Sequence, residues 1–259
     1  MLIPVTDYTQ VARAVNGLLL QSGATNGIPD REKLEREICQ GTLFLAEAPC
    51  GLLLLRRRPH RDILNFLLKK GERLHGWKPE RPTISELPFR REGEPMEDVA
   101  EDMEALGFSM ILKRIRYTRK GSAHEVYPCE GVEDCREEKD SYRILQECFS
   151  PLTGCIPSAE EWEALCRKGK ILCLPGGVLH YEEKGKTTEL RHLAVTQNRR
   201  GCGYGRALVG AYLNRCGTVL SRVWTGEENL TARRLYESYG YEKDGWTSRV
   251  YYFDKDEEL

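Results

Sequence analysis

Residues 190–209 read LRHLAVTQNRRGCGYGRALV, and this stretch decides the fold. An apolar strand pattern leads through a polar turn to the arginines at 199–200, and glycines at 201, 203 and 205 then precede a helical pattern. Glycine adopts positive φ and lets the backbone approach a ligand closely, so N–H groups can converge on an anion at the positive end of a helix dipole. The arginines can pair with phosphate oxygens. The stretch therefore predicts a cradle for a pyrophosphate-bearing cofactor.

Two common phosphate-binding motifs do not fit this chain. In the dinucleotide pattern G-x-G-x-x-G/A, the last position falls on Arg206 or on Leu208, depending on the starting glycine. Residues 185–187 read GKT, as in a Walker motif, but the position five residues before Gly185 is His180 rather than glycine. Neither a dinucleotide nor a Walker-type nucleotide is therefore predicted.

What remains is Arg200-Gly201-x-Gly203-x-Gly205, directly after a strand that ends at Val195. This pattern resembles the acetyl-CoA loop, Q/R-x-x-G-x-G/A, of the GNAT superfamily of N-acetyltransferases. The resemblance implies an α/β (α+β) fold with a mixed, mostly antiparallel central sheet flanked by helices. It also implies acetyl-CoA as co-substrate and no metal. A glycine-rich strand-to-helix turn without a ligand is the alternative interpretation of the same residues.

A second motif lies in residues 225–245, TGEENLTARRLYESYGYEKDG. Asn229, Ala232, Tyr236 and the Gly240-Tyr241 pair are similar to the family pattern N-x-x-A-x-x-L/F-Y-x-x-x-G-F. The resemblance covers residues 123–254. It implies that Asn229 contacts the cofactor arm and that Tyr236 protonates the departing thiolate, which a phenol of pKa about 10 can do when within reach. Packing of Tyr236 against the core is the alternative.

The resemblance also implies where the thioester lies. In the family the central strand splays from its neighbour here, and a backbone N–H near Val195 binds the thioester carbonyl, an interaction worth a few kcal/mol. Cys202 offers a covalent route, but its neighbours are expected to bind phosphate, so direct attack is favoured. The expected acetyl-CoA contacts, by side chain or backbone, are Leu193, Ala194, Val195, Arg199, Arg200, Gly201, Cys202, Gly203, Tyr204, Gly205, Arg206, Asn229, Ala232, Arg233 and Tyr236.

Glu189 is the candidate general base. It lies six residues before Val195, where many members of the family carry this group. An attacking amine is protonated at neutral pH, so a base must remove a proton, directly or through a water. The competing interpretation is a structural carboxylate paired with Arg191 or with a neighbouring strand. Both interpretations stay open at this point.

The two-residue period of a strand predicts which side chains share a face. Glu189, Arg191 and Leu193 are expected on one face, and Leu190, His192 and Ala194 on the other. His192 is therefore the weaker base candidate, and we interpret it as a half-buried packing residue.

The chain contains an internal repeat. Residues 28–55, IPDREKLEREICQGTLFLAEAPCGLLLL, align with residues 156–181, IPSAEEWEALCRKGKILCLPGGVLHY. A repeat of this length indicates two copies of one fold. We expect a degenerate domain at 1–120 that lacks the phosphate-binding loop, an acetyltransferase domain at 121–259, and a linker near Lys120-Gly121-Ser122. The first copy is expected to serve packing, substrate walls or dimerisation, and a homodimer is among the oligomeric states left open.

Composition excludes several classes. The 259 residues contain 39 Lys+Arg and 40 Asp+Glu, for a net charge of -1, which does not favour binding along a whole nucleic-acid or membrane surface. No run is long enough to span a bilayer and no cleavable leader is evident, so a cytoplasmic location is expected. Ten cysteines occur without C-x-x-C spacing, which favours reduced thiols over disulfides or a metal site.

Two short basic runs raise the alternative of an RNA-associated module. Arg56-Arg57-Arg58 stands with His60 and Arg61, and Arg90-Arg91 forms the second run. We interpret them as solvated hairpin ends, and nucleic acid is not an expected partner. The expected function is transfer of an acetyl group from acetyl-CoA to a primary amine of an unidentified small molecule or peptide. A non-catalytic acyl-CoA-binding or regulatory protein is the alternative.

Overall fold

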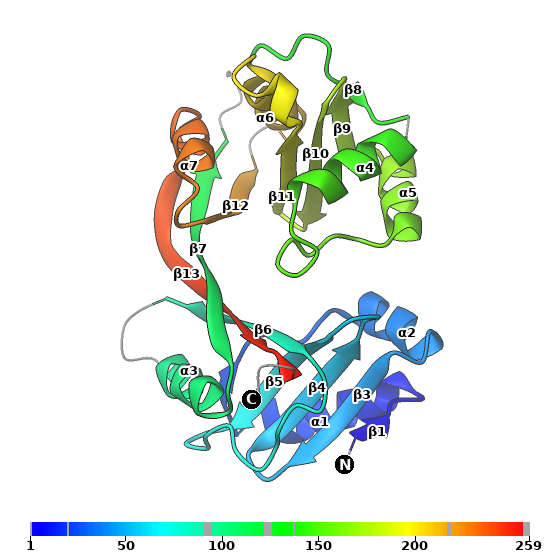
Figure 1. Cartoon of the computed structure of the whole chain (residues 1–259), viewed down its shortest axis with the longest axis vertical. Helices are drawn as coiled ribbons and strands as arrows, with labels where there is room; N and C mark the ends of the chain where they lie inside the picture. Colours follow the sequence, from blue (N-terminus) through cyan, green and yellow to red (C-terminus); the bar gives the residue numbers. More distant parts are fainter. Residues whose placement is uncertain are drawn as a thin grey trace. The chain divides into compact units, whose positions relative to one another are not determined.

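The computed structural model describes residues 2–19, 21–90, 95–121, 126–136, 138–216 and 219–255 (Figure 1). The chain divides into two compact units. Unit 1 comprises Met1–Lys113 and Trp246–Leu259, and unit 2 comprises Arg114–Gly245. Ser122 of the expected linker and Arg91 of the second basic run lie outside the described residues.

Unit 1 is built on a sheet whose strands follow the order β1 (Leu2–Pro4), β3 (Leu43–Ala48), β4 (Gly51–Arg57), β5 (Asp62–Lys69), β6 (Thr83–Phe89) and β13 (Glu242–Phe253). A short strand, β2 (Ser22–Thr25), also pairs with β5. The helices are α1 (Tyr8–Leu19), α2 (Arg31–Cys39) and α3 (Pro95–Ala105). Neighbouring strands are antiparallel except β5 and β6, which are parallel.

Apolar residues line both faces of the unit 1 sheet. On one face Val11 of α1 and Leu34 of α2 pack with Leu54. On the other face Met103 of α3 packs with a cluster that includes Leu53. Leu53 and Leu54 are adjacent in β4, and successive side chains of a strand point to opposite faces, so each contributes to a different core.

Unit 2 repeats this plan. Its sheet follows the order β8 (Glu133–Asp134), β9 (Ile171–Leu174), β10 (Gly177–Lys184), β11 (Thr187–Val195), β12 (Leu220–Gly226) and β7 (Ser109–Lys120). The helices are α4 (Glu138–Cys148), α5 (Ala159–Arg167), α6 (Tyr204–Cys216) and α7 (Leu230–Glu237), with a short 3-10 turn at Gln197–Arg199. Strands β11 and β12 are parallel, as β5 and β6 are in unit 1.

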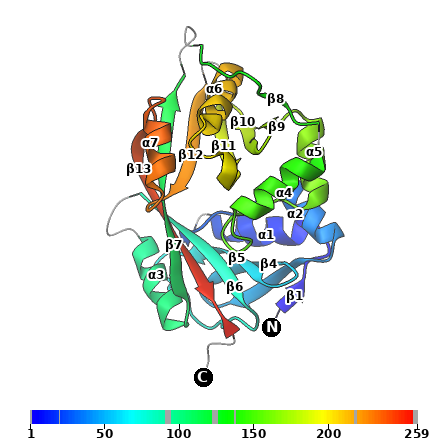
Figure 2. The same cartoon turned by 45° about the horizontal axis from the view of Figure 1, so that its top comes forward.

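Each face of the unit 2 sheet has its own core. Leu208 of α6 and Tyr236 of α7 belong to one cluster, whereas Leu145 of α4 and Trp162 of α5 belong to another. Figure 2 shows α4 and α5 together on one side of β10 and β11 and α6 on the other. We refer below to the α6 face and the α4 face of this sheet.

The expected fold, two tandem copies of a mixed and mostly antiparallel sheet flanked by helices, is confirmed by these elements. The two units differ from the linear division expected at residue 120. Residues 114–120 of β7 pair with β12 in unit 2, while residues 247–253 of β13 pair with β6 in unit 1. Each long strand therefore contributes to both units. Residues 70–82, between β5 and β6, contain no helix, so α6 has no counterpart in unit 1.

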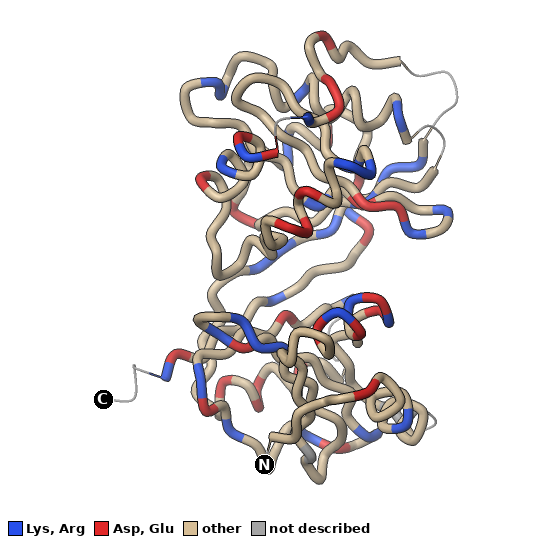
Figure 3. The backbone as a smooth tube through the Cα atoms, turned by 90° about the vertical axis from the view of Figure 1, so that its right-hand side faces the viewer, with Lys and Arg blue, Asp and Glu red and all other residues tan. Residues whose placement is uncertain are grey.

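Several findings bear on partners. All ten cysteines are free thiols. In the described part of the chain, no group of three His, Cys, Asp or Glu side chains is placed to hold a metal ion. None of the helices of the described residues is long and apolar enough to cross a membrane. Lys and Arg are interspersed with Asp and Glu in both units (Figure 3).

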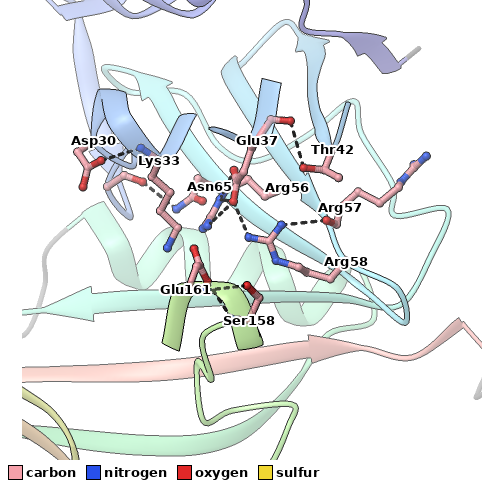
Figure 4. Close-up of polar contacts among 11 residues, drawn as sticks. Asp30, Lys33, Glu37, Thr42, Arg56, Arg57, Arg58, Asn65, Ser158 and Glu161 are labelled. Atoms are coloured by element: carbon pink, nitrogen blue, oxygen red, sulfur yellow. Dashed lines mark hydrogen bonds and ion pairs between the residues drawn. The ribbon is translucent and has the colours of Figure 1, made fainter. Parts of the chain in front are cut away.

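The first basic run is not a solvated hairpin end. Arg56 and Arg58 both bind the carboxylate of Glu37, with Nη2–Oε1 distances of 2.8 and 2.5 Å (Figure 4). Glu37 is only 2% exposed and Arg56 only 6%. Burial opposes ionisation, but the hydrogen bonds from the two arginines outweigh it and lower the pKa of Glu37. The run therefore anchors α2 to β4, and the sequence interpretation was wrong for Arg56.

Candidate functional site

Strands β11 and β12 separate partway along their length. Their parallel pairing runs from Thr187 with Leu220 to Leu190 with Val223 and then ends, although both strands continue. At the paired end, buried hydroxyls of Thr188, Tyr212 and Ser221 are joined by contacts of 2.7 Å. Beyond Leu190 the edge of β11 that faces β12 has no strand partner among the described residues. We call this unpaired edge the slot of unit 2.

Backbone groups of β11 point into this slot. Thr196 N–H donates to the Gly176 carbonyl on the β10 side, at 2.9 Å. The N–H and C=O of one strand residue point to the same edge, and successive residues alternate. Leu193 and Val195 therefore turn their backbone groups toward the slot. An extended ligand with amide groups can pair with them as a strand would.

Unit 1 has the same separation, but its own chain fills it. Pairing of β5 with β6 covers only Asp62–Thr83 and Ile63–Ile84. Beyond that point β2 adds to β5. The side-chain amide of Asn26 donates to the Leu64 carbonyl and to Ser85 Oγ, both at 3.0 Å, and accepts from Phe66 N–H at 2.8 Å. Asn26 thus bridges β5 and β6 where unit 2 leaves its slot unpaired.

The glycine loop lies at the end of the unit 2 slot, just before α6. Gly201 and Gly203 have φ of +79° and +84°, and a Cβ on either would meet nothing within 4 Å. Residues 201–203 are exposed. The N–H groups of 204–206 form the first turn of α6, where they have no intrahelical acceptor. The loop therefore offers a conformation that favours glycine, open space and unpaired amides, which fits a pyrophosphate.

Arg199 and Arg200 flank the loop, and both are exposed. Arg200 Nε donates to the Val195 carbonyl oxygen at 3.1 Å, and the Arg199 guanidinium lies 5.9 Å from the Tyr204 ring centre. Within the described residues, neither guanidinium makes a hydrogen bond to residues 201–203. Cys202 is exposed, and its thiol contacts the Arg200 carbonyl oxygen at 3.7 Å.

Tyr236 lies in α7 against the α6-face core and is 4% exposed. Its hydroxyl has no hydrogen-bond partner among the described residues. Burial, with a smaller contribution from Tyr241, raises the pKa of Tyr236 well above that of a free phenol. The phenol is therefore protonated at any physiological pH, as a proton donor must be.

The other expected residues of α7 have structural contacts. Asn229 is the N-cap, and its side chain accepts from Ala232 N–H at 3.0 Å. Arg233 donates to Tyr117 Oη at 3.2 Å and to the Glu227 carbonyl oxygen at 2.9 Å. Ala232 is partly buried beside Tyr236 in the same core. These residues fix the start of α7 and thereby the place of Tyr236.

The Glu189 carboxylate is paired. Arg191 Nη1 donates to it at 2.6 Å, and Lys184 Nζ lies 3.8 Å away. In the sheet Glu189 stands opposite Glu182 on β10 and Arg222 on β12. The ion pair expected for a structural carboxylate is therefore present.

The expected alternation along β11 is wrong beyond Leu190. His180 pairs with His192 but the next residue, Tyr181, pairs with Leu190, so Arg191 is an extra residue in a β-bulge. The bulge reverses the faces: Leu190 and Leu193 pack in the α6-face core, while His192 contacts Phe149 at 5.1 Å between ring centres on the α4 face. His192 thus shares a face with Glu189 rather than opposing it.

His192 is fully buried rather than half-buried, at 3% exposure, and it stacks on the equally buried His180. Their Nδ1 atoms are 3.0 Å apart, and His192 Nε2 lies 2.7 Å from the Gly154 carbonyl oxygen. His192 must carry its proton on Nε2 to bind that carbonyl, so its Nδ1 accepts from His180. Burial lowers the pKa of His192 to about 4 and that of His180 to about 2.

Side chains from α4, β7 and β11 hold residues 151–157, the loop between α4 and α5; Tyr142 of α4 donates to the Pro157 carbonyl at 2.8 Å. His192 binds the Gly154 carbonyl, and Arg114 Nη2 donates to the Thr153 carbonyl at 2.5 Å. The corresponding segment of unit 1, between α1 and α2, contains β2 and enters the slot. Sequence reasoning missed Arg114, His180 and Arg222 as site residues. His180 and Arg222 are register partners of His192 and Glu189, so they can be identified as site residues only once the strand pairing is known.

Comparison with known proteins agrees with this geometry. Residues 160–243 match the family model described as the acetyltransferase (GNAT) domain. No curated protein matches the chain.

Solved structures of similar fold span nearly the whole chain. A GCN5-related N-acetyltransferase from Sphaerobacter thermophilus is 16% identical, with a TM-score of 0.57, 97% of this chain and 94% of that chain covered. A tandem GNAT protein from the clavulanic acid biosynthesis pathway is 12% identical, with a TM-score of 0.60 and 97% of each chain covered. A GNAT-family acetyltransferase from Colwellia psychrerythraea is 10% identical, with a TM-score of 0.55 and 98% of each chain covered. At these sequence identities the structural similarity shows only that the fold is shared.

Proposed function

We propose that this chain, a member of the GNAT acetyltransferase family through its residues 160–243, transfers an acetyl group from acetyl-CoA to a primary amine in unit 2. The observation that carries the proposal is the contrast between the two slots. Asn26 and β2 occupy the slot of unit 1, whereas the slot of unit 2 is unpaired in the described residues and ends at exposed, positive-φ glycines.

The residues of unit 2 divide the binding task. The backbone groups of Leu193 and Val195 pair with the amides of the pantetheine arm, and the amides of 202–206 hold the pyrophosphate at the start of α6. Arg199 and Arg200 add charge once their side chains turn from their present contacts to the phosphates. Ala194, Tyr204, Asn229, Ala232 and Arg233 line or support this path. When bound, acetyl-CoA supplies the activated thioester.

Three groups of the chain carry the reaction. Glu189 removes a proton from the acceptor ammonium through a water, since Arg191 already occupies one carboxylate oxygen. The Leu193 N–H, directed into the slot, stabilises the negative charge that develops on the thioester oxygen. Tyr236 donates its phenolic proton to the departing thiolate.

Unit 1 has a different role in this proposal. With its slot filled and with no helix in residues 70–82 to match α6, it binds no acyl-CoA and serves as a packing or substrate-positioning copy. We therefore assign the acetyltransferase site to the second copy alone.

Release of free CoA thiol with a panel of primary amines tests the proposal. We expect turnover with at least one amine, and about 10²-fold or greater loss in Glu189→Gln and in Tyr236→Phe. A protein that binds acetyl-CoA and releases no thiol with any amine would instead be an acyl-CoA sensor. Equal activity in both variants and the parent would reject the assigned roles.

A further inference from the structure

Four arginines of unit 2 lie on the α4 face of the sheet, around the slot: Arg114, Arg116, Arg191 and Arg222. Leu190 and Val223, the last paired residues of β11 and β12, both pack in the α6-face core. Their neighbours Glu189 and Arg222, also a register pair, therefore point to the opposite, α4 face. Arg116 stands opposite Trp224 and lies 5.5 Å from its ring centre on the same face.

Other groups of unit 2 engage three of the four guanidinium groups: Arg191 is bound by Glu189 (2.6 Å) and Glu182 (3.8 Å), Arg116 by Asp244 (2.7 Å), and Arg114 by the Thr153 carbonyl oxygen (2.5 Å). The carboxylates among these partners are therefore occupied by arginines other than Arg222.

Arg222 is the fourth cation of this group. Its side chain is half-buried, yet within the described residues no hydrogen bond or ion pair reaches it, and its Nε atom is buried without an acceptor. Even Glu189, directly opposite in the sheet, pairs with Arg191 and Lys184 instead. A buried guanidinium N–H that has lost water without gaining an acceptor is costly. An anionic group of a ligand would relieve that cost.

The position of Arg222 indicates where such an anion lies relative to the acceptor amine. Arg222 lies one residue pair before the point where β11 and β12 separate. Leu193, which faces the slot, pairs with Leu179, three residues from Glu182, the partner of Glu189, so it lies about 10 Å farther along the sheet. A small molecule whose amine lies at the slot can therefore reach the Arg222 side chain with a group carried several bonds from that amine.

The charge on the face selects the kind of anion. A single free guanidinium matches the single negative charge and the two coplanar oxygens of a carboxylate, which it binds through two parallel N–H···O bonds. A phosphate monoester carries close to two negative charges, and the other three arginines of this group are already engaged. The arrangement therefore fits a carboxylate better than a phosphate.

We propose that Arg222 binds a carboxylate of the acceptor, so that the acceptor is a small amine bearing a carboxylate, such as an amino acid acetylated on its side-chain amine. This assignment rests on the proposed acetyl transfer in unit 2, and it selects one class among the amines which that activity allows. Arg222 acts here as a residue that determines acceptor specificity.

Matched pairs of amines test the assignment. Lysine is compared with cadaverine, ornithine with putrescine, and 5-aminopentanoate with butylamine, because the second member of each pair is the first without its carboxylate. We expect the carboxylate-bearing member to have the higher kcat/KM. In Arg222→Gln its KM is expected to rise about 10- to 100-fold, with kcat nearly unchanged, while the decarboxylated amine is unaffected. Arg222→Lys keeps the charge and is expected to recover part of the loss.

Arg167→Gln, on the exposed outer surface of α5, is the matched control and is expected to leave both members of each pair unchanged. A second measurement does not depend on a variant that folds: inhibition of the unmodified protein by the N-acetylated products. The product with the carboxylate is expected to inhibit at lower concentration than the one without it.

The outcomes separate the two proposals. Equal kcat/KM for both members of every pair, or equal loss for both in Arg222→Gln, would overturn the carboxylate assignment while leaving acetyl transfer intact. Preference for an amine that carries a phosphonate in place of the carboxylate would overturn it as well. Binding of acetyl-CoA without thiol release for any amine would overturn the proposed function itself.

Discussion

His180 and His192 stack on each other in the interior of unit 2, with their Nδ1 atoms 3.0 Å apart. Because burial lowers the pKa values of both rings, the pair is neutral in the folded chain near neutral pH and takes up protons more readily in the unfolded chain. His192 also holds the Gly154 carbonyl. The pair therefore connects the stability of unit 2 to the position of the loop at residues 151–157.

The pair predicts a loss of stability in mild acid. Between pH 6.5, near the pKa of an unfolded histidine, and about pH 4, the pKa of His192 in the folded chain, the unfolded state binds more protons, so stability falls as pH falls. For His192 alone the expected decrease from pH 7 to pH 5 is about 2 kcal/mol. Chemical denaturation at a series of pH values measures it.

His192→Gln keeps an amide donor for the Gly154 carbonyl and removes one titrating ring. We expect a shallower dependence of unfolding free energy on pH in this variant and no change in His60→Gln, since His60 is exposed. An unaltered slope in His192→Gln would show that the buried pair does not cause the acid sensitivity.

Replacement of Gly203 is expected to weaken the binding of acetyl-CoA. At φ of +84° an alanine is strained by about 1–2 kcal/mol, so Gly203→Ala relaxes the loop away from the conformation that presents its amides. We expect acetyl-CoA to bind about 5- to 30-fold more weakly. Gly185→Ala is the control, since Gly185 has φ of +60° and open space around it but lies in the turn between β10 and β11. Similar weakening in both variants would argue against the loop as the phosphate site.

The role proposed for Tyr236 predicts how kcat depends on pH. Because burial raises the pKa of Tyr236 well above that of a free phenol, the proton donor stays protonated, and kcat is not expected to fall between pH 7 and pH 10. In Tyr236→Phe kcat is expected to drop about 10²-fold with little change in the KM for acetyl-CoA. Steady-state kinetics across this range measure both. A normal kcat in Tyr236→Phe would leave Tyr236 as a packing residue.

Replacement of Asn26 is expected to destabilise unit 1. Asn26→Ala removes three hydrogen bonds between the segment after β2 and strands β5 and β6, so the part-buried Phe66 N–H loses its acceptor while the Leu64 carbonyl keeps only Ser85 Oγ. We expect a loss of about 1–3 kcal/mol and faster amide hydrogen exchange at Leu64 and Phe66. Asn214→Ala, which removes exposed bonds to Tyr127, is expected to cost less. Unchanged exchange in β5 would show that the segment does not close the slot.

Local signals in the sequence were sufficient for several parts of this structure. Ser158 followed three residues later by Glu161 is a capping-box pattern, and both reciprocal hydrogen bonds are present (Figure 4). The glycines at 201 and 203 were expected to adopt positive φ, and they do. In each case neighbouring residues alone decide the conformation, so the sequence pattern contains the necessary information.

Features that depend on pairing between distant segments could not be predicted. Two glycines within residues 23–27 favour a break in regular structure, yet Ser22–Thr25 is a strand, since β5 supplies the partner. The bulge at Arg191 inserts one residue and reverses the faces of β11, which a strict two-residue period does not anticipate. Pairing of residues 247–253 with β6 likewise depends on a segment far away in the chain.

The central claim is that only the slot of unit 2 accepts the pantetheine arm and pyrophosphate of acetyl-CoA. Isothermal titration calorimetry of the full chain with acetyl-CoA tests it most directly. The account predicts one molecule bound per chain, with affinity reduced in Gly203→Ala and retained in Asn26→Ala. Two molecules bound per chain, or no binding heat at any concentration, would contradict it.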